Sequence, residues 1–475
     1  MDARTAEKWA LEEFGATSLG DVRRTRRLVA MACGAMRHPS GKVSSVFNRA
    51  ADREGAYDFL ESKHVDVESV ARSVFEATAT RAEGVSWVYA AVDGSPLSLT
   101  DKSGSKGFGP VGSPNIPVQG LMVTNALAVS RDGVPLGLID QLYWTRREPE
   151  PGLTKREKVQ RSLKRSFEEK ETANLLRAAQ HTHERLESRG CHAWVVIDRE
   201  GDNRDILLGL HELGCRFTVR GKWDRKLFGE DSNIHQALDG EPSLGTHDVA
   251  IPRRGNRAAR TARLDVRAKQ VTLRFVARDG MPRQALRLYA VRVREVCVEP
   301  GVEGLEWLLL TNVPVLSAAH ARDVVDSYRA RWRIEEFHRT WKQGGCNVED
   351  AQLRSAKAVQ LWATVLAAIA TRIERLKYFS RSKPTEPAST ELAAEEIEAL
   401  TLDRRSRNKE RRRATNAMPS IKVATEWLAE LGGWIGAGNG PPGSIVLARG
   451  LERLAYLVEG IALARRPPSK KRPPT

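Results

Sequence analysis

Cysteine is scarce in this sequence, and its placement excludes several classes of protein. The chain has 475 residues, of which five are cysteines. They are odd in number and scattered, and no two of them form the CxxC pair that is typical of zinc sites. We therefore expect reduced thiols in a cytoplasmic protein rather than a disulfide framework.

We also find no long hydrophobic run and no secretory signal. No apolar run is expected to reach the length of a membrane span, and the first residues do not follow a signal-peptide pattern. Association with a membrane, whether as a span or at an anionic surface, is therefore the weaker interpretation, and we expect no membrane partner.

Positive charge, by contrast, is in excess. Lys and Arg number 76 and Asp and Glu number 60, which gives a formal net charge of +16. This balance favours a polyanionic partner, either nucleic acid or an anionic membrane surface. Hydrophobic residues make up 41% of the chain, which is enough for real cores. The length exceeds that of one ordinary core, so two or three domains are expected.

The first sixty-odd residues have the pattern of small helices. Asp21 is an N-cap candidate, and apolar residues recur at helical spacing from Leu28 to Ala35. A second short helix is predicted over residues 51–62. Four arginines occupy the first two turns after the cap, namely Arg23, Arg24, Arg26 and Arg27. Their placement opposes the helix dipole, which DNA phosphates would compensate, although an ordinary cationic helix start is the alternative.

The hydrophobic period then changes to that of strands. Strands are predicted near residues 86–93, 121–130, 134–144, 192–198, 215–223, 270–278, 286–296 and 306–312. One long polar helix is predicted over residues 155–189, and residues 224–252 are predicted to be loops. From residue 320 onward the pattern is mostly helical.

The C-terminal part combines an apolar stripe with two basic segments. The stripe repeats in steps of four and three and consists of Leu447, Leu451, Leu454, Val458 and Ile461. Burial within its own subunit is the first interpretation, and a dimer contact is the alternative. Residues 404–413 form a basic run, and residues 465–475 are predicted to be a disordered basic tail.

Two aspartates close strongly apolar strands. Asp93 ends "VYAAVD" and Asp198 ends "WVVID". Ligands of open parallel sheets gather at the carboxyl ends of strands, so these two carboxylates could converge. Turn chemistry explains either aspartate alone, since Asp favours strand ends for its own backbone hydrogen bonds.

The stretch "YRARWRIEEFHRTWK" supplies a third carboxylate. On a regular helix four polar side chains fall within about 60° of one another, namely Tyr328, Arg331, Glu335 and Lys342. The opposite, apolar face is formed by Ile334, Phe337 and Trp341. A solvated ion-pair face explains the charges, but it does not explain the aromatic residues Tyr328 and Trp332 among them. A site for phosphate and metal needs that mixture.

These residues resemble the signature of a known protein family. The pattern Y-x2-R-x3-E-x6-K resembles the signature of bacterial cut-and-paste transposases of the Tn-five (IS-four) group. The strings "RWRIEEFHRTWK", "SLGDVRRTRRLV", "EGAYDFL", "IDREGD" and "WLLLT" are also similar to the prototype of that group, in the same order. The resemblance covers most of the first 345 residues, and the C-terminal third matches only loosely.

The resemblance implies an α/β fold with a ribonuclease-H-like catalytic domain. The implied division is an N-terminal helical DNA-binding domain over residues 1–68, the catalytic domain over residues 69–380 and, over residues 381–475, a C-terminal helical domain for dimerisation and DNA contact with a basic tail. A β-rich insertion is expected at about residues 224–315. The implied DDE triad is Asp93, Asp198 and Glu335.

The resemblance also implies roles around the triad. Trp307 matches the position of a tryptophan that helps displace a base, and Trp332 that of the residue on which the base stacks. Without the resemblance, a strand tryptophan in a sheet core is the first interpretation of Trp307. Arg220 and Lys222 match positions that contact DNA, and Tyr328, Arg331 and Lys342 are expected to hold the adjacent phosphate.

The implied reaction is phosphoryl transfer on DNA with two Mg²⁺ ions, for which Mn²⁺ is an alternative. No general-base histidine is required. End nicking, hairpin formation and resolution, and strand transfer are expected on double-stranded DNA, at transposon ends and at the target. A homodimer in a synaptic complex and a bacterial, nucleoid-associated location are implied. An inactive DNA-binding relative and a nuclease of the same fold without end synapsis are the alternatives.

Overall fold

The computed structural model describes residues 6–112, 118–146, 152, 154–251, 260–277, 283–298, 303–407 and 418–465. Much of the basic run at residues 404–413 and nearly all of the basic tail lie outside the described residues. The N-terminal helices are α1 (Ala6–Phe14), α2 (Val22–Arg37), α3 (Val43–Val46), α4 (Ala50–Glu61) and α5 (Val67–Arg81). The expected cap is present, because the Asp21 side chain accepts a hydrogen bond from the Arg23 N–H.

Ten strands form one mixed sheet. They are β1 (Trp87–Ser98), β2 (Gly109–Pro110), β3 (Gln119–Val129), β4 (Pro135–Trp144), β5 (His192–Ile197), β6 (Arg216–Arg220), β7 (Thr246–Ile251), β8 (Arg260–Phe275), β9 (Gln284–Val296) and β10 (Glu306–Thr311). The order is β2-β3-β1-β5-β6-β10-β9-β8-β7, and β4 pairs with β3. Strands β1, β5 and β6 are parallel, and the other pairings are antiparallel.

This arrangement confirms the predicted fold class. The five strands β4, β3, β1, β5 and β6 form the ribonuclease-H-like part, and the β-rich insertion extends the same sheet from its β6 edge through β10. The central strands are buried on both faces, which explains their nearly continuous apolar runs. Strand β8 alternates between buried and exposed side chains, as expected for a half-solvated antiparallel strand.

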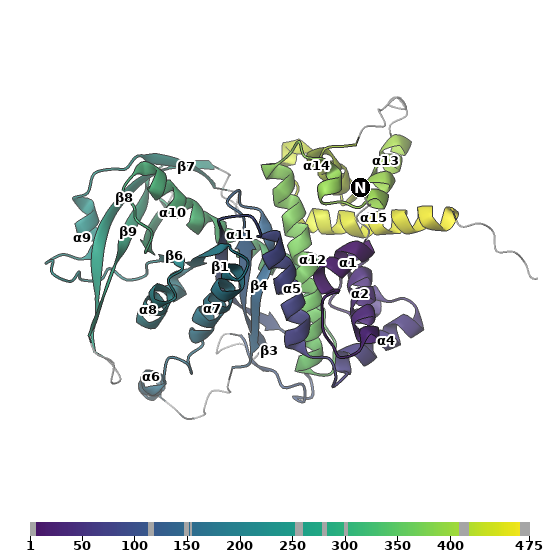
Figure 1. Ribbon diagram of the computed structural model, residues 1–475, viewed down its shortest axis with the longest axis horizontal. Coiled ribbons are helices and arrows are strands. Elements are labelled where there is room, and N and C mark those ends of the chain that lie inside the picture. The colour runs from purple at the N-terminus through teal and green to yellow at the C-terminus, as the bar shows by residue number, and fades with distance from the viewer. Residues whose placement is uncertain are drawn as a thin grey trace, which may run out of the picture.

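Helices lie on both faces of the sheet. Along this part of the chain the helices are α6 (Lys155–Lys164), α7 (Ala173–Glu187), α8 (Arg204–Glu212), α9 (Ile234–Asp239), α10 (Ala318–Ala330), α11 (Trp332–Arg339) and α12 (Ala356–Ser382). Helices α13 (Ala394–Arg407), α14 (Ile421–Leu431) and α15 (Ser444–Ala464) follow. Figure 1 shows α12 between the sheet and the group formed by the N-terminal and C-terminal helices. One hydrophobic core joins α12, one face of the sheet and both helical groups, so the catalytic part is packed against both ends of the chain.

Helix α12 corrects one expectation. Among the described residues it is the one helix whose length and composition would suit a membrane span, with a mean hydropathy of 1.2 in its most apolar window. The expectation that no run reaches that length is therefore wrong. Because 78% of that window is buried inside the protein, α12 is the central core helix of the fold.

Two further expectations about elements need correction, and a third is supported in part. The single helix predicted over residues 155–189 is two helices, α6 and α7, because Phe167 in the connection packs against the core. The loop predicted over residues 224–252 contains α9 and β7, whose few apolar residues are enough to bury one side. In the C-terminal stripe Leu447, Leu451 and Leu454 are buried, which supports packing within the subunit for that part of α15.

Candidate active site

The two candidate aspartates meet because two strands are parallel and in register. Val92 of β1 pairs with Ile197 of β5, so Asp93 and Asp198 follow at adjacent positions of the sheet. The sequence pattern predicted that Asp93 ends its strand, and this prediction is wrong. Strand β1 leaves β5 at this point but continues to Ser98 by pairing with β3. Asp198 does end its strand, and its carboxylate accepts the Glu200 N–H at 2.8 Å.

The helix that carries Glu335 is not regular. The expectation of one continuous helix that turns by about 100° per residue is therefore wrong. Helix α10 ends at Ala330, and α11 starts at Trp332. At the junction the Arg331 N–H donates to Tyr328 O and the Ile334 N–H donates to Arg331 O, which are tight i to i−3 bonds. A π-helix, η2 (Thr340–Gly344), follows α11. The predicted apolar face is confirmed, since Ile334, Phe337 and Trp341 are fully buried.

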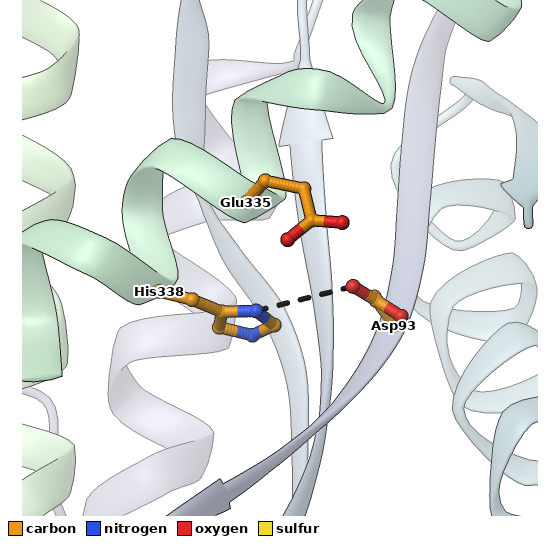
Figure 2. Close-up of side chains that lie close together, drawn as sticks. All are labelled: Asp93, Glu335 and His338. Carbon is orange, nitrogen blue, oxygen red and sulfur yellow. Dashed lines mark ion pairs between the residues drawn. The ribbon is translucent and has the colours of Figure 1, made fainter. Parts of the chain in front are cut away.

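Glu335 and Asp93 nevertheless lie close together, with a third residue beside them. Ligand atoms of Asp93, Glu335 and His338 all lie within 4.8 Å of one another. Figure 2 shows Glu335 and His338 projecting from the same helix toward Asp93 on its strand. Asp198 lies outside this group of three, but its charge acts on Asp93 and on Arg331.

The electrostatics of this cluster are those of an undercompensated anionic site. Burial, and then the charges of Glu335 and Asp198, raise the pKa of Asp93 from its ordinary value of 3.8 to about 7, although Arg331 opposes the shift. Arg331 Nη1 lies 3.8 Å from Asp93 Oδ2 and 3.2 Å from Glu335 Oε1. One guanidinium therefore contacts two of the carboxylates, and the charge of Asp198 acts on it as well. Hard oxygen ligands with excess negative charge fit a divalent cation such as Mg²⁺.

His338 was missed by the sequence interpretation. Its Nδ1 lies 4.0 Å from Asp93 Oδ2, the contact dashed in Figure 2. Burial, then the charges of Lys342 and Arg331, lower the pKa of His338 to about 3, so the ring is neutral at physiological pH. A usable signal was present, because a residue three positions after Glu335 on a helix lies on the same face.

A row of polar side chains crosses the sheet next to Asp93. Asn125 of β3 pairs with Asp93, and Gln141 of β4 pairs with Asn125. Gln141 Nε2 donates to Asn125 Oδ1 at 2.9 Å, and Asn125 Nδ2 lies 3.0 Å from His338 Nε2. Both amides are buried in mostly apolar strands, each beside one other buried polar residue, Thr124 in β3 and Asp140 in β4. Sequence reasoning did not select them, although a buried amide inside an apolar strand is a recognisable signal.

Lys342 reaches the site from the π-helix. Its Nζ donates to Pro96 O at 2.5 Å and lies 3.4 Å from both Ser95 Oγ and Glu349 Oε1. An open pocket of about 500 Å³ is lined by Lys342, Asp93, Glu335 and His338, together with neighbouring residues. The ammonium group thus lies at the same concave surface as the carboxylates.

The predicted aromatic residues differ sharply in exposure. Trp307 is 7% exposed and packs edge-on against the buried Tyr328, with ring centroids 5.2 Å apart. Arg220 Nη1 lies 3.4 Å from the Tyr328 hydroxyl. Trp332 is 47% exposed, and the Arg331 guanidinium lies 5.5 Å from its ring centroid. Of these two tryptophans, Trp332 is the one available for stacking in this conformation, and Trp307 lies beneath the surface.

A buried aspartate that sequence reasoning also missed holds the Lys222 loop. Asp202 Oδ2 accepts the N–H groups of Lys222 at 2.6 Å and Trp223 at 3.1 Å, and its other oxygen pairs with Arg225. This loop follows β6, the neighbour of β5, so it lies at the sheet edge to which Asp198 belongs. Lys222 and the exposed Trp223 are thus presented on a fixed backbone.

The predicted N-terminal arginines do not form one equivalent set. Arg23, Arg26 and Arg27 are exposed at the start of α2. Arg24 is half-buried, and its guanidinium donates to Leu19 O at 2.8 Å. The exposed three are accessible to a ligand, although the Arg27 guanidinium lies against Gly55 of α4, whereas Arg24 ties the preceding turn to the helix.

Comparison with known protein families gives two matches. A family described as "Transposase DNA-binding" matches residues 6–65, the segment that contains α1 to α4. A family described as "Transposase DDE domain" matches residues 169–372. The second match contains Asp198 and Glu335 together with strands β5 to β10, and it begins after Asp93.

Proposed function

Since this chain is a DDE transposase that carries its own transposase DNA-binding domain, we propose that it performs cut-and-paste transposition in the manner of the Tn-five (IS-four) group. The N-terminal helices bind transposon ends, and the phosphoryl transfers occur at Asp93, Asp198 and Glu335. The observation that carries the proposal is the approach of Asp93 and Glu335, far apart along the chain, to within 4.8 Å.

The three carboxylates are the residues that would hold two Mg²⁺ ions, with Mn²⁺ as an alternative. The pKa of about 7 at Asp93 is consistent with this assignment, because burial, and to a smaller extent the charges of Glu335 and Asp198, make the ionised carboxylate costly without a cation beside it. When bound, such ions activate the attacking oxygen and stabilise the leaving oxygen of an in-line displacement. Arg331 keeps the cluster together without neutralising it, since it contacts both Asp93 and Glu335.

The surrounding residues position the DNA strand. Arg331 and Lys342 supply positive charge for the phosphate next to the scissile bond, and Arg220 and Lys222 contact the strand farther along the sheet edge. Tyr328 holds the Arg220 and Arg331 guanidinium groups near its ring, at 6.0 and 5.7 Å. It therefore acts on the phosphate through these two arginines.

Hairpin formation by the freed 3′-hydroxyl needs a sharply bent strand, so one base must leave the stack at a cost of a few kcal/mol. Trp332 is proposed as the surface on which that base stacks, because it is half exposed and close to Arg331. Trp307 is proposed to displace the base, which requires the residue to leave its packed position on Tyr328. The freed ends are then joined to target DNA.

Cleavage is proposed to occur in a homodimer that holds two transposon ends, at the nucleoid of a bacterial cytoplasm. The exposed residues Tyr456 and Leu463 on α15 support a contact between subunits, since they extend beyond the buried part of the helix.

The test uses the inverted repeats that flank the coding region as cleavage substrates. Wild-type protein with Mg²⁺ should nick a duplex that carries one repeat, and gel-shift stoichiometry should show two ends in one complex. Glu335→Gln should lose at least about 10³-fold in nicking rate while end binding is nearly unchanged, because the missing carboxylate serves chemistry.

The neighbouring carboxylate provides a matched control. Glu336 points away from the site and forms ion pairs with Arg333 and Lys377. Glu336→Gln should therefore nick at a rate close to that of the wild-type protein. Equal losses in both variants, or loss of end binding in Glu335→Gln, would show that α11 is only structural. Nicking without paired ends would favour a nuclease that does not synapse.

A further inference from the structure

The hydrogen bonds in the row of polar side chains beside Asp93 all run in one direction, from Gln141 through Asn125 to His338. The Tyr143 hydroxyl donates to Gln141 Oε1 at 2.9 Å, so the Gln141 amide turns its NH₂ group toward Asn125. Asn125 then turns its own NH₂ group toward His338 Nε2 at 3.0 Å. Because Nε2 faces a donor, it must be the acceptor, and the single proton of the neutral ring lies on Nδ1.

The opposite direction fits the described contacts less well. If both amides were reversed, Gln141 would present NH₂ to the Tyr143 hydroxyl, which would need another acceptor for its own proton. The other contact of that hydroxyl is Thr364 Oγ1 at 3.4 Å, which is longer than the 2.9 Å bond to Gln141. The single proton of the Thr364 hydroxyl can be donated either to Gln141 Oε1 at 3.0 Å or to Gln360 O at 2.9 Å, and the first of these bonds is possible only when Oε1 faces α12. The packing of α12 on β4 therefore sets the orientation of the row.

The N–H bond at Nδ1 of His338 is directed toward Asp93, the candidate metal-binding carboxylate. His338 Nδ1 lies 4.0 Å from Asp93 Oδ2, a separation that a small side-chain movement shortens to a hydrogen bond. The ring itself is 6% exposed and packs beside Phe337, so its orientation is constrained. A histidine held in this tautomer cannot offer an Nδ1 lone pair to a metal ion.

We propose that His338 is a positioning residue, held as the Nδ1–H tautomer by Asn125 and Gln141 to donate to Asp93, and that it is not a metal ligand. The inference rests on the proposed function only where it assigns metal binding to Asp93. Its consequence is that the long core helix α12, through Thr364, shares in orienting a catalytic carboxylate.

The tautomer can be measured without any activity assay. The chain has ten histidines, so protein labelled with ¹⁵N-histidine gives a small set of ring signals in a two-bond ¹H–¹⁵N spectrum. The His338 signals are assigned by their loss in His338→Asn and by their broadening with Mn²⁺. The expected pattern in the metal-free protein is a protonated Nδ1. Asn125→Asp replaces the donor with an acceptor and should move the proton to Nε2.

Two conservative variants test the donor position. Asn carries its amide at the level of Nδ1, whereas Gln carries it at the level of Nε2. His338→Asn should therefore keep Mn²⁺ affinity within about threefold, and His338→Gln should weaken it by about 10-fold to 100-fold. If His338 had only a structural role, both variants would bind Mn²⁺ weakly, and both would show a lowered unfolding midpoint.

Electron spin-echo spectroscopy of bound Mn²⁺ distinguishes the remaining alternative. The proposal expects no directly coupled ¹⁴N in the wild-type protein. A ¹⁴N coupling that disappears in His338→Gln would overturn it and make His338 a ligand, as would an Nε2–H tautomer in the metal-free protein. Failure of the proposed function is separate: it would appear as Mn²⁺ binding that is unchanged in Asp93→Asn, whatever the tautomer of His338.

Discussion

Replacing Asp93 by asparagine should stabilise the metal-free protein while abolishing its activity. The carboxyl has a pKa of about 7 in the folded chain against an ordinary value of 3.8, a shift of about 3 pH units. At about 1.36 kcal/mol for each unit, the ionised side chain costs the fold roughly 4 kcal/mol above pH 7. Asn keeps the shape and the polarity, and it removes the charge that faces Glu335 and Asp198.

The sign of the pH dependence follows from the raised pKa. Below about pH 4 the carboxyl is protonated in both the folded and the unfolded chain, so wild type and Asp93→Asn should differ little. Between about pH 4 and pH 7 the unfolded chain loses its proton first, so the wild-type protein becomes progressively less stable than the variant. Above about pH 7 the difference should be constant.

The assay is thermal or guanidinium unfolding of both proteins in EDTA at several pH values. Taking the difference between the two cancels the titration of other groups. Added Mg²⁺ or Mn²⁺ should stabilise wild type, and it should have little effect on Asp93→Asn. If the variant is no more stable at pH 8, or if the difference does not change with pH, the reasoning about an undercompensated anionic site is wrong.

Further outcomes are expected at the residues proposed to contact DNA. Trp332→Ala should nick normally but lose about 10-fold to 100-fold in hairpin formation, since base stacking contributes about 1–3 kcal/mol; normal hairpin yield would remove its stacking role. Trp307→Ala should impair hairpin formation and also lower the unfolding free energy by about 3–5 kcal/mol, because Trp307 is buried. Changing Arg23, Arg26 and Arg27 to Ala should reduce the salt dependence of end binding, with a slope change of about 0.9 for each DNA phosphate that the variant no longer neutralises. An unchanged slope would mean an ordinary cationic helix start.

The strands could be predicted from the sequence because the central ones are buried on both faces. Their apolar runs mark β1, β3, β4 and β5 clearly, and each predicted strand overlaps an observed one. The parallel register that brings Asp93 next to Asp198 could only be stated as a hypothesis. This register depends on the pairing of strands that are far apart in the chain. The period of the hydrophobic residues along one strand does not show which other strand it pairs with.

The candidate site was predictable in its charges but not in its geometry. The Arg331–Glu335 contact follows from i, i+4 spacing, and it is present at 3.2 Å. The interruption at Arg331 and the π-helix depend on tertiary packing, so a regular helical projection missed them. Such irregular turns commonly occur at functional sites.

His338 and the amides beside it were missed for a different reason. The expected chemistry does not require a general base, so the sequence pattern assigns no role to a histidine. Asn125 and Gln141 gain their meaning only from cross-strand pairing with Asp93. A polar residue within an apolar strand is visible in sequence, but its partner is not.

An anomalous-difference map of the protein, crystallised with a transposon-end duplex and Mn²⁺, tests most directly whether Asp93, Asp198 and Glu335 form one metal-binding site. Peaks are expected at about 2.1 Å from oxygens of all three carboxylates. Metal bound elsewhere, with no peak between Asp93 and Glu335, would contradict the proposed chemistry.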